Sequence, residues 1–142
     1  MIRLLLTLPW LMTAVSPVDY APKANLKIEI SNIEQQKGTI FIAVFKPGEE
    51  FPEGKPADAK KVSVTGATAT ATIPLEPGQY AVAIFHDVNS NNKMDKNMLG
   101  IPKEPYGFSM NFKPKMSKPK FSDCQITVGE AGKTIDIKLI RF

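Results

Sequence analysis

The sequence is poor in the residues that form disulfides and zinc sites. Cys124 is the one cysteine among 142 residues, so no disulfide can form within the chain. His86 is the one histidine, and one cysteine with one histidine cannot supply the ligands of a Cys/His zinc centre. Cys124 lies in a strand-like apolar pattern, which predicts a buried and unreactive thiol.

Long apolar runs are absent after the N-terminal segment. Residues 1–16 contain a positive start at Arg3, then an apolar stretch, then the small residues Ala14 and Ser16. This pattern predicts a cleaved signal peptide over 1–16 and a short leader over 17–25, with an uncleaved membrane anchor or a disordered leader as the alternatives. The apolar stretch is short for a bilayer span, and we expect no transmembrane segment after cleavage. The sequence therefore predicts a periplasmic or secreted protein.

Helical periodicity is also absent from the rest of the chain, whereas short alternating segments are frequent. Twelve prolines and nine glycines favour many short elements. Strand patterns occur at residues 26–31, 39–45, 61–65, 67–73, 80–85, 121–128 and 135–139. The continuously apolar segment 39–45 predicts a central strand covered on both faces. We therefore predict one all-β domain over 26–142, a single antiparallel β-sandwich of about seven strands, immunoglobulin-like, with a long loop after the fifth strand.

Acidic and amide side chains alternate directly after the strand pattern at 80–85. Asp87, Asn89 and Asn91 take positions 1, 3 and 5 of a loop. Lys93 offers its backbone carbonyl at position 7, and Asp95 follows at position 9. Alternate residues of a tight loop direct their oxygens to one centre, which is the spacing of calcium loops. We predict that these five residues bind calcium, with a Kd on the order of 10⁻⁴ to 10⁻³ M because only two of them are carboxylates.

The loop nevertheless departs from an EF-hand. Asn92 stands where glycine is usual, although asparagine tolerates a left-handed backbone. Met98 occupies position 12, where a thioether cannot replace a bidentate glutamate, and a strand precedes the loop instead of a helix. A further ligand would come from Glu104 or Asp123. The open alternative is a metal-free loop whose Asp and Asn side chains cap their own backbone. We expect His86 to hydrogen-bond a loop carbonyl or carboxylate.

The residues around the loop resemble a known family. The central run is His86-Asp87-x-Asn89-x-Asn91-x-Lys93-x-Asp95-x-Asn97-x-x-Gly100-x-Pro102-x-Glu104-x-Tyr106-Gly107-Phe108-Ser109, with Pro77-Gly78-x-Tyr80-Ala81 before it and Pro119-x-Phe121 after it. This pattern is similar to that of exported bacterial proteins of family 2141 of the domains of unknown function, over about Leu26 to Phe142. The resemblance implies a compact periplasmic or secreted β-sandwich, similar to transthyretin-like domains, with no established activity or ligand. Met110 is a departure, because the family has asparagine directly after Phe-Ser.

Two functional hypotheses without catalysis follow. The first is an exported domain, monomeric, with a binding or structural role in the cell envelope and an envelope protein or polysaccharide as partner. The second is a carbohydrate- or polymer-binding module that uses Tyr106, Phe108 and the lysine-rich loop at 113–120, although packing alone also explains the aromatic residues. The net charge of +4 is too small to indicate nucleic acid as a partner.

Enzymatic chemistry has few candidates in this sequence. His86-Asp87 resembles a pair found in metal-dependent phosphohydrolases, but those sites need further histidines. No glycine-rich phosphate loop is present. We therefore expect that the protein is not an enzyme. The weakest hypothesis is a small hydrolase that uses the carboxylates in and after the loop, namely Asp87, Asp95, Glu104 and Asp123.

Overall fold

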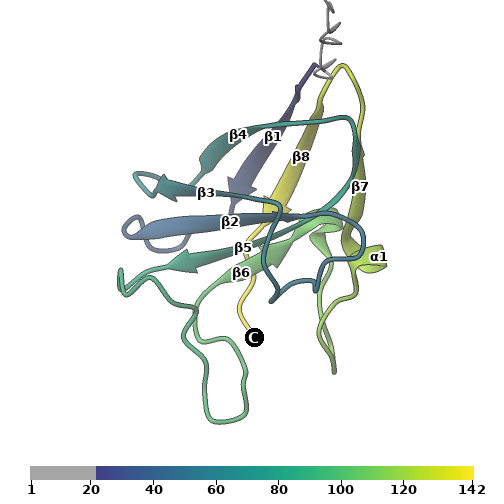
Figure 1. Cartoon of the computed structure of the whole chain (residues 1–142). Coiled ribbons are helices and arrows are strands. Elements are labelled where there is room, and N and C mark those ends of the chain that lie inside the picture. Colours follow the sequence, from purple (N-terminus) through teal and green to yellow (C-terminus); the bar gives the residue numbers. More distant parts are fainter. Residues whose placement is uncertain (1–21) are drawn as a thin grey trace, which may run out of the picture.

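The computed structural model describes residues 22–142 and shows two β-sheets that enclose one core (Figure 1). The small sheet has the order β4–β1–β8, and the large sheet has the order β3–β2–β5–β6, with β7 also paired to β5. The strands are β1 (Ala24–Ser31), β2 (Thr39–Phe45), β3 (Asp58–Ser63), β4 (Ala69–Leu75), β5 (Gly78–Asp87), β6 (Tyr106–Phe108), β7 (Gln125–Val128) and β8 (Lys133–Lys138). The prediction of an all-β sandwich is confirmed. Among the described pairs, β1–β8 is parallel and the others are antiparallel.

Several predicted boundaries differ from the structure. The first half of the strand expected at 121–128 is a helical turn, α1 (Phe121–Cys124), because the Asp123 carboxylate accepts the Lys120 N–H at 2.8 Å and turns the chain. The short strand β6 and the 3₁₀ turn η1 (Ser109–Asn111) were not expected. β1 begins inside the predicted leader at 17–25. The predicted signal peptide at 1–16 and the leader up to residue 21 lie outside the described residues.

The two sheets bury an aliphatic core between them. Leu26, Ile28 and Ile30 of β1 are buried while the polar residues between them are exposed, as their alternation predicts. Facing residues of the large sheet complete this core, namely Ile40, Ile42, Val44, Val82 and Ile84. Each fully buried aliphatic side chain contributes about 1.5–3 kcal/mol. This core fixes which side chains of the large sheet point outward.

Gly107 allows β6 and β8 to approach closely. A Cβ atom at Gly107 would lie 2.7 Å from Cγ2 of Ile137, which is fully buried and cannot move aside. The glycine in the Tyr106-Gly107-Phe108 motif is therefore required by packing between the two sheets.

The outer face of the large sheet is covered by loops. The β2–β3 loop (46–57), the β5–β6 loop (88–105) and the segment 112–120 all contribute side chains over this face. The β5–β6 loop is the long loop predicted after the fifth strand. The expectation that β2 is covered on both faces holds only in part, because Phe41 and Ala43 are half-buried on the outer side. Phe51 covers one end of this face, with its ring 5.2 Å from the ring of Phe45.

Candidate functional site

Asp87 is the last residue of β5, and the loop begins from a tightly packed point. Gly38 has a φ of +77°, and a Cβ atom there would lie 2.2 Å from the Asp87 carbonyl oxygen. His86 is fully buried, and its Nε2 lies 2.6 Å from the Lys37 carbonyl oxygen. The expected hydrogen bond of His86 to a carbonyl is present, but it reaches the β1–β2 connection and not the Asp87–Asp95 loop. Its Nδ1 is the one buried side-chain N or O atom without a partner in residues 22–142.

The Asp87 carboxylate closes the first half of the loop. Its Oδ1 accepts the Asn91 N–H at 3.1 Å, and its Oδ2 accepts the Asn92 N–H at 2.8 Å. Asn92 has a φ of +62°, the left-handed conformation expected at this position. The carboxylate is almost completely buried and therefore orders the backbone around it.

Asn89 and Asn91 converge on Asp95 in the second half of the loop. Their side-chain amides donate to the Asp95 carboxylate at 2.7 Å and 2.9 Å. These hydrogen bonds, from Asn91 first and then from Asn89, lower the pKa of Asp95. The Lys93 N–H donates to Oδ1 of Asn91 at 2.9 Å, so Lys93 contacts the loop through its N–H and not through the carbonyl oxygen predicted as a ligand. The structure therefore brings all five predicted residues together.

Glu104 holds the two ends of the loop. Its side chain is buried, with Oε1 accepting the Val88 N–H at 3.1 Å and Oε2 accepting the Asp95 N–H at 3.3 Å. Glu104 therefore acts as a brace for the loop, in the sense that one carboxylate joins the backbone at Val88 to the backbone at Asp95. Asp123, the other carboxylate considered as a ligand, caps α1 instead.

The loop is capped by its own side chains in the structure. Residues 22–142 contain no group of three or more His, Cys, Asp or Glu side chains placed to hold a metal ion. A cation would therefore depend on amide oxygens in addition to the carboxylates of Asp87 and Asp95. Each asparagine amide carries an oxygen and a nitrogen on one planar group, so a half-turn of Asn89 or Asn91 would present oxygen to the centre where nitrogen now lies. Such a turn would break the hydrogen bonds that Oδ1 of Asn89 accepts from the Asn91 N–H and Oδ1 of Asn91 accepts from the Lys93 N–H.

A groove of about 820 Å³ lies on the outer face of the large sheet, beside the loop. Ala59, Ala43 and Ala83 are paired directly across β3, β2 and β5 and form a row of small side chains. The next row contains Phe41 and Phe85, whose rings stack at 4.7 Å between centroids. Side chains on the same face of a strand are two residues apart, so the row of alanines lies directly beside the row of Phe41 and Phe85. The small alanine side chains therefore leave a trough next to a wall formed by the two phenylalanine rings.

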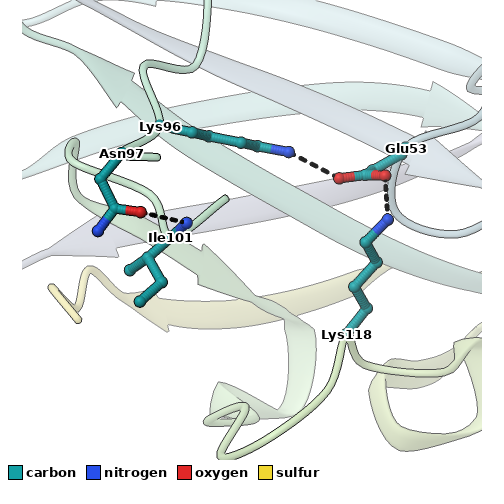
Figure 2. Close-up of polar contacts among 5 residues, drawn as sticks. All are labelled: Glu53, Lys96, Asn97, Ile101 and Lys118. Carbon is teal, nitrogen blue, oxygen red and sulfur yellow. Dashed lines mark hydrogen bonds and ion pairs between the residues drawn. The ribbon is translucent and has the colours of Figure 1, made fainter. Parts of the chain in front are cut away.

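Three loops meet above this groove through one carboxylate. Glu53 of the β2–β3 loop pairs with Lys96 of the β5–β6 loop at 2.8 Å and with Lys118 of the segment 112–120. Figure 2 shows the two lysines reaching the carboxylate from different loops. The hydrogen bonds from Lys118 and then from Lys96 lower the pKa of Glu53. Nearby, Asn97 Oδ1 accepts the Ile101 N–H at 3.0 Å and shapes the tip of the β5–β6 loop (Figure 2).

A family model described as an uncharacterized protein conserved in bacteria (DUF2141) matches residues 28–136. The chain belongs to this family. The matched range of the DUF2141 domain includes the Asp87–Asp95 loop, Glu104 and every strand of the groove floor. No curated protein and no solved structure matches the chain. Within residues 22–142, no helix is long and apolar enough to cross a membrane.

The residues of the second hypothesis also meet at the groove of this DUF2141 domain. Tyr106 and Phe108 are buried on β6 and line the groove together with Lys115 and Lys118 of the lysine-rich loop. Their burial shows that both aromatic side chains are packing residues as well as lining residues. Sequence reasoning missed Glu53, because a glutamate in a Pro- and Gly-rich loop gives no signal of its two partners, which lie 43 and 65 residues away.

Proposed function

We propose that this protein is an exported, non-catalytic domain of the bacterial cell envelope whose Asp87–Asp95 loop takes a calcium ion. One observation carries the calcium proposal, namely the convergence of the Asn89 and Asn91 amides and the Asp95 carboxylate on one point beside Asp87. Asp87 and Asp95 would supply charge, while Asn89, Asn91 and the Lys93 carbonyl would supply neutral oxygen. Calcium takes six to eight oxygen ligands, so water would complete the set.

The ion would act as a structural part of the domain. The loop connects β5 to the wall of the groove through Met94 and Lys96, which both line it. A cation that joins Asp87 to Asp95 would stiffen this wall. Among the residues that line the groove, Glu53 is the one acidic side chain, and it is paired with lysines. Glycoside hydrolysis needs two carboxylates.

Thermal unfolding in chelator and in 10 mM calcium tests the metal proposal. With a Kd of about 0.1–1 mM, binding adds roughly 1.4–2.7 kcal/mol to the free energy of unfolding, and the Tm rises by roughly 5–10 °C. Asp95→Asn should remove this rise, whereas Asp58→Asn, which changes an exposed aspartate of β3, should retain it. An equal Tm with and without calcium in the wild type would leave the self-capped loop as the correct description.

Export is tested separately. Expression of the full chain in a bacterium, followed by fractionation and intact-mass measurement, should find a shortened protein in the periplasm or medium. Full-length protein in the cytosol would contradict export, whatever the result with calcium.

A further inference from the structure

The groove on the large sheet is apolar over almost its whole lining. Its floor is the row Ala59, Ala43 and Ala83, and one wall is the stacked pair Phe41 and Phe85. Phe108 is paired with Ala83 across β5 and β6 and closes the row at its inner end. The volume of the groove, about 820 Å³, falls within the range of roughly 300–1,000 Å³ that is typical of small-molecule sites.

The trough is bordered on one side by the row of Phe41 and Phe85 and on the other by the row of Phe45 and Ala81. Phe41 and Phe45 lie four residues apart on β2, which places their Cα atoms roughly 13 Å apart. Phe45 is sealed under Phe51, so the space between the two rows is the width of the alanine row alone. An extended chain fits this shape, whereas the broad surface of a folded partner does not.

Exposed apolar side chains continue the groove at its mouth. Leu99 is 83% exposed and Met116 is 98% exposed, and both line the groove from the two loops that flank it. Met94 also lines the groove. Flexible methionine and leucine side chains adapt to hydrocarbon of different lengths, so these loops can close over a chain that lies on the alanine row.

The charges around the groove are mainly positive. Lys96, Lys115 and Lys118 line it, and Glu53 is the acidic member of the lining, so the three lysines and one glutamate sum to +2. Lys96 and Lys118 share Glu53, while Lys115 has no ion-pair partner among the described residues. Such a rim complements a ligand with one negative group.

The polar groups of the lining are too few for a sugar. Carbohydrate recognition needs hydrogen-bond partners for several hydroxyl groups. Apart from the charged residues of the rim, Tyr106 and Ser117 supply the hydroxyl groups of the lining, and the other lining side chains are apolar. The apolar floor and the cationic rim together suit a molecule with a hydrocarbon part and an anionic part.

We propose that this groove binds a single-chain anionic amphiphile of the fatty acid class. The hydrocarbon chain lies on the row Ala59, Ala43 and Ala83 between the two rows that border it, and the carboxylate pairs with Lys96, Lys115 and Lys118. Glu53 occupies two of these lysines in the structure and is therefore an internal competitor for the ligand head group. Binding replaces the Glu53 ion pairs by pairs with the ligand.

The test is titration of the protein, purified in the form that the cell accumulates, with dodecanoate below its micelle concentration, followed by calorimetry. Dodecyltrimethylammonium is the cationic counterpart with the same chain. All titrations contain chelator, so the result does not depend on the calcium proposal. We expect dodecanoate to bind at least tenfold more tightly than the cation. Equal affinities would overturn the proposal, because they would indicate hydrophobic adsorption without a head-group site.

Variants locate the site. Ala43→Phe fills the centre of the trough, and Ala59→Phe fills its end on the edge strand β3, where the residue is exposed and tolerance to size is high. Each should weaken dodecanoate binding at least tenfold, whereas Ala131→Phe in the exposed β7–β8 turn should not. Circular dichroism confirms folding of each variant. Unchanged affinity in both folded groove variants would overturn the proposal.

Charge variants test the head-group site. The double variant Lys96→Met/Lys118→Met should weaken dodecanoate binding about tenfold, while Lys133→Met on β8 should leave it unchanged. Glu53→Gln should tighten binding two- to tenfold, because it removes the competing carboxylate. Weaker binding by Glu53→Gln would overturn the competitor role.

Two other results would assign the groove to a different occupant. Binding of chitohexaose without binding of dodecanoate would assign the groove to a polysaccharide. A dimer in sedimentation that Ala59→Phe disrupts, without amphiphile binding, would assign it to a second copy of the chain. Either result would overturn the proposal.

Discussion

The Oγ atom of Ser109 accepts a hydrogen bond from the backbone N–H of Val82 at 2.9 Å. Val82 falls between the parts of β5 that pair with β7 (residues 78–81) and with β6 (residues 83–85), so neither strand reaches its N–H. Ser109 is fully buried and donates in turn to the Cys124 carbonyl at the end of α1. The Ser109 hydroxyl therefore supplies the hydrogen-bond partner that β5 lacks between β7 and β6.

Ser109→Ala should destabilise the protein by about 2–3 kcal/mol, because it leaves a buried N–H and a buried carbonyl without partners. Urea unfolding measures the change. Ser122→Ala, which removes an exposed hydroxyl from α1, is the matched control and should change the free energy of unfolding by less than about 0.5 kcal/mol. Equal effects of the two substitutions would show that the Val82 N–H finds another partner.

Glu104 is the brace of the Asp87–Asp95 loop, and its removal should loosen the loop. Glu104→Ala leaves the N–H groups of Val88 and Asp95 unpaired, and we expect a loss of about 2–3 kcal/mol in the free energy of unfolding. Glu104→Gln keeps one acceptor and should cost less. Glu130→Gln in the exposed β7–β8 turn serves as the control.

Hydrogen exchange gives a second measure of the same prediction. In Glu104→Ala, the amides of Val88 and Asp95 should exchange faster than in the wild type while the amides of β1 do not change. Uniformly faster exchange would indicate a global loss of stability and not a local brace.

The features that depend on residues close together in the sequence could be predicted. The alternation in β1 fixes its buried face, since side chains on a strand alternate with a period of two. The convergence of Asn89 and Asn91 on Asp95 was also predictable, because these residues are four to six positions apart and one tight loop brings them together. Three consecutive residues of β6, with a glycine in the middle, are too few to show a period.

The groove could not be predicted, because its floor depends on register. Ala59, Ala43 and Ala83 become one row only when three strands pair with the observed offsets. A shift of one residue in β2 would turn Ala43 into the core and bring Ile42 to the outer face. The Glu53 ion pairs could not be predicted for a similar reason, because they join three loops that only the fold brings together.

Met110 should be replaceable with a gain in stability. It follows the buried Ser109 and has a φ of +64°, a left-handed conformation that suits asparagine and disfavours methionine. Its side chain is 66% exposed, so little packing is lost on substitution. Met110→Asn should raise the free energy of unfolding by about 0.5–1 kcal/mol. Met98→Asn, at an exposed methionine without a positive φ, should show no such gain.

The ion pairs of Glu53 predict a pH-dependent contribution to stability. Lys118 and Lys96 lower the pKa of Glu53 in the folded protein from its ordinary value of 4.5, so the carboxylate contributes stability above that value. This contribution is lost as the pH falls through the lowered pKa. Because the side chain is 41% exposed, the effect is small, about 0.5 kcal/mol or less at neutral pH.

Glu53→Gln should therefore be less stable than the wild type at pH 7, and the two proteins should converge as the pH falls below the lowered pKa of Glu53. The difference between urea midpoints of the two proteins is the proper measure, because Asp95 also has a lowered pKa and contributes to acid sensitivity in both. Glu130→Gln, without a lysine partner among the described residues, should show no difference at either pH. A difference between Glu53→Gln and wild type that persists unchanged at pH 3 would mean that the glutamate acts through packing of the β2–β3 loop and not through its charge.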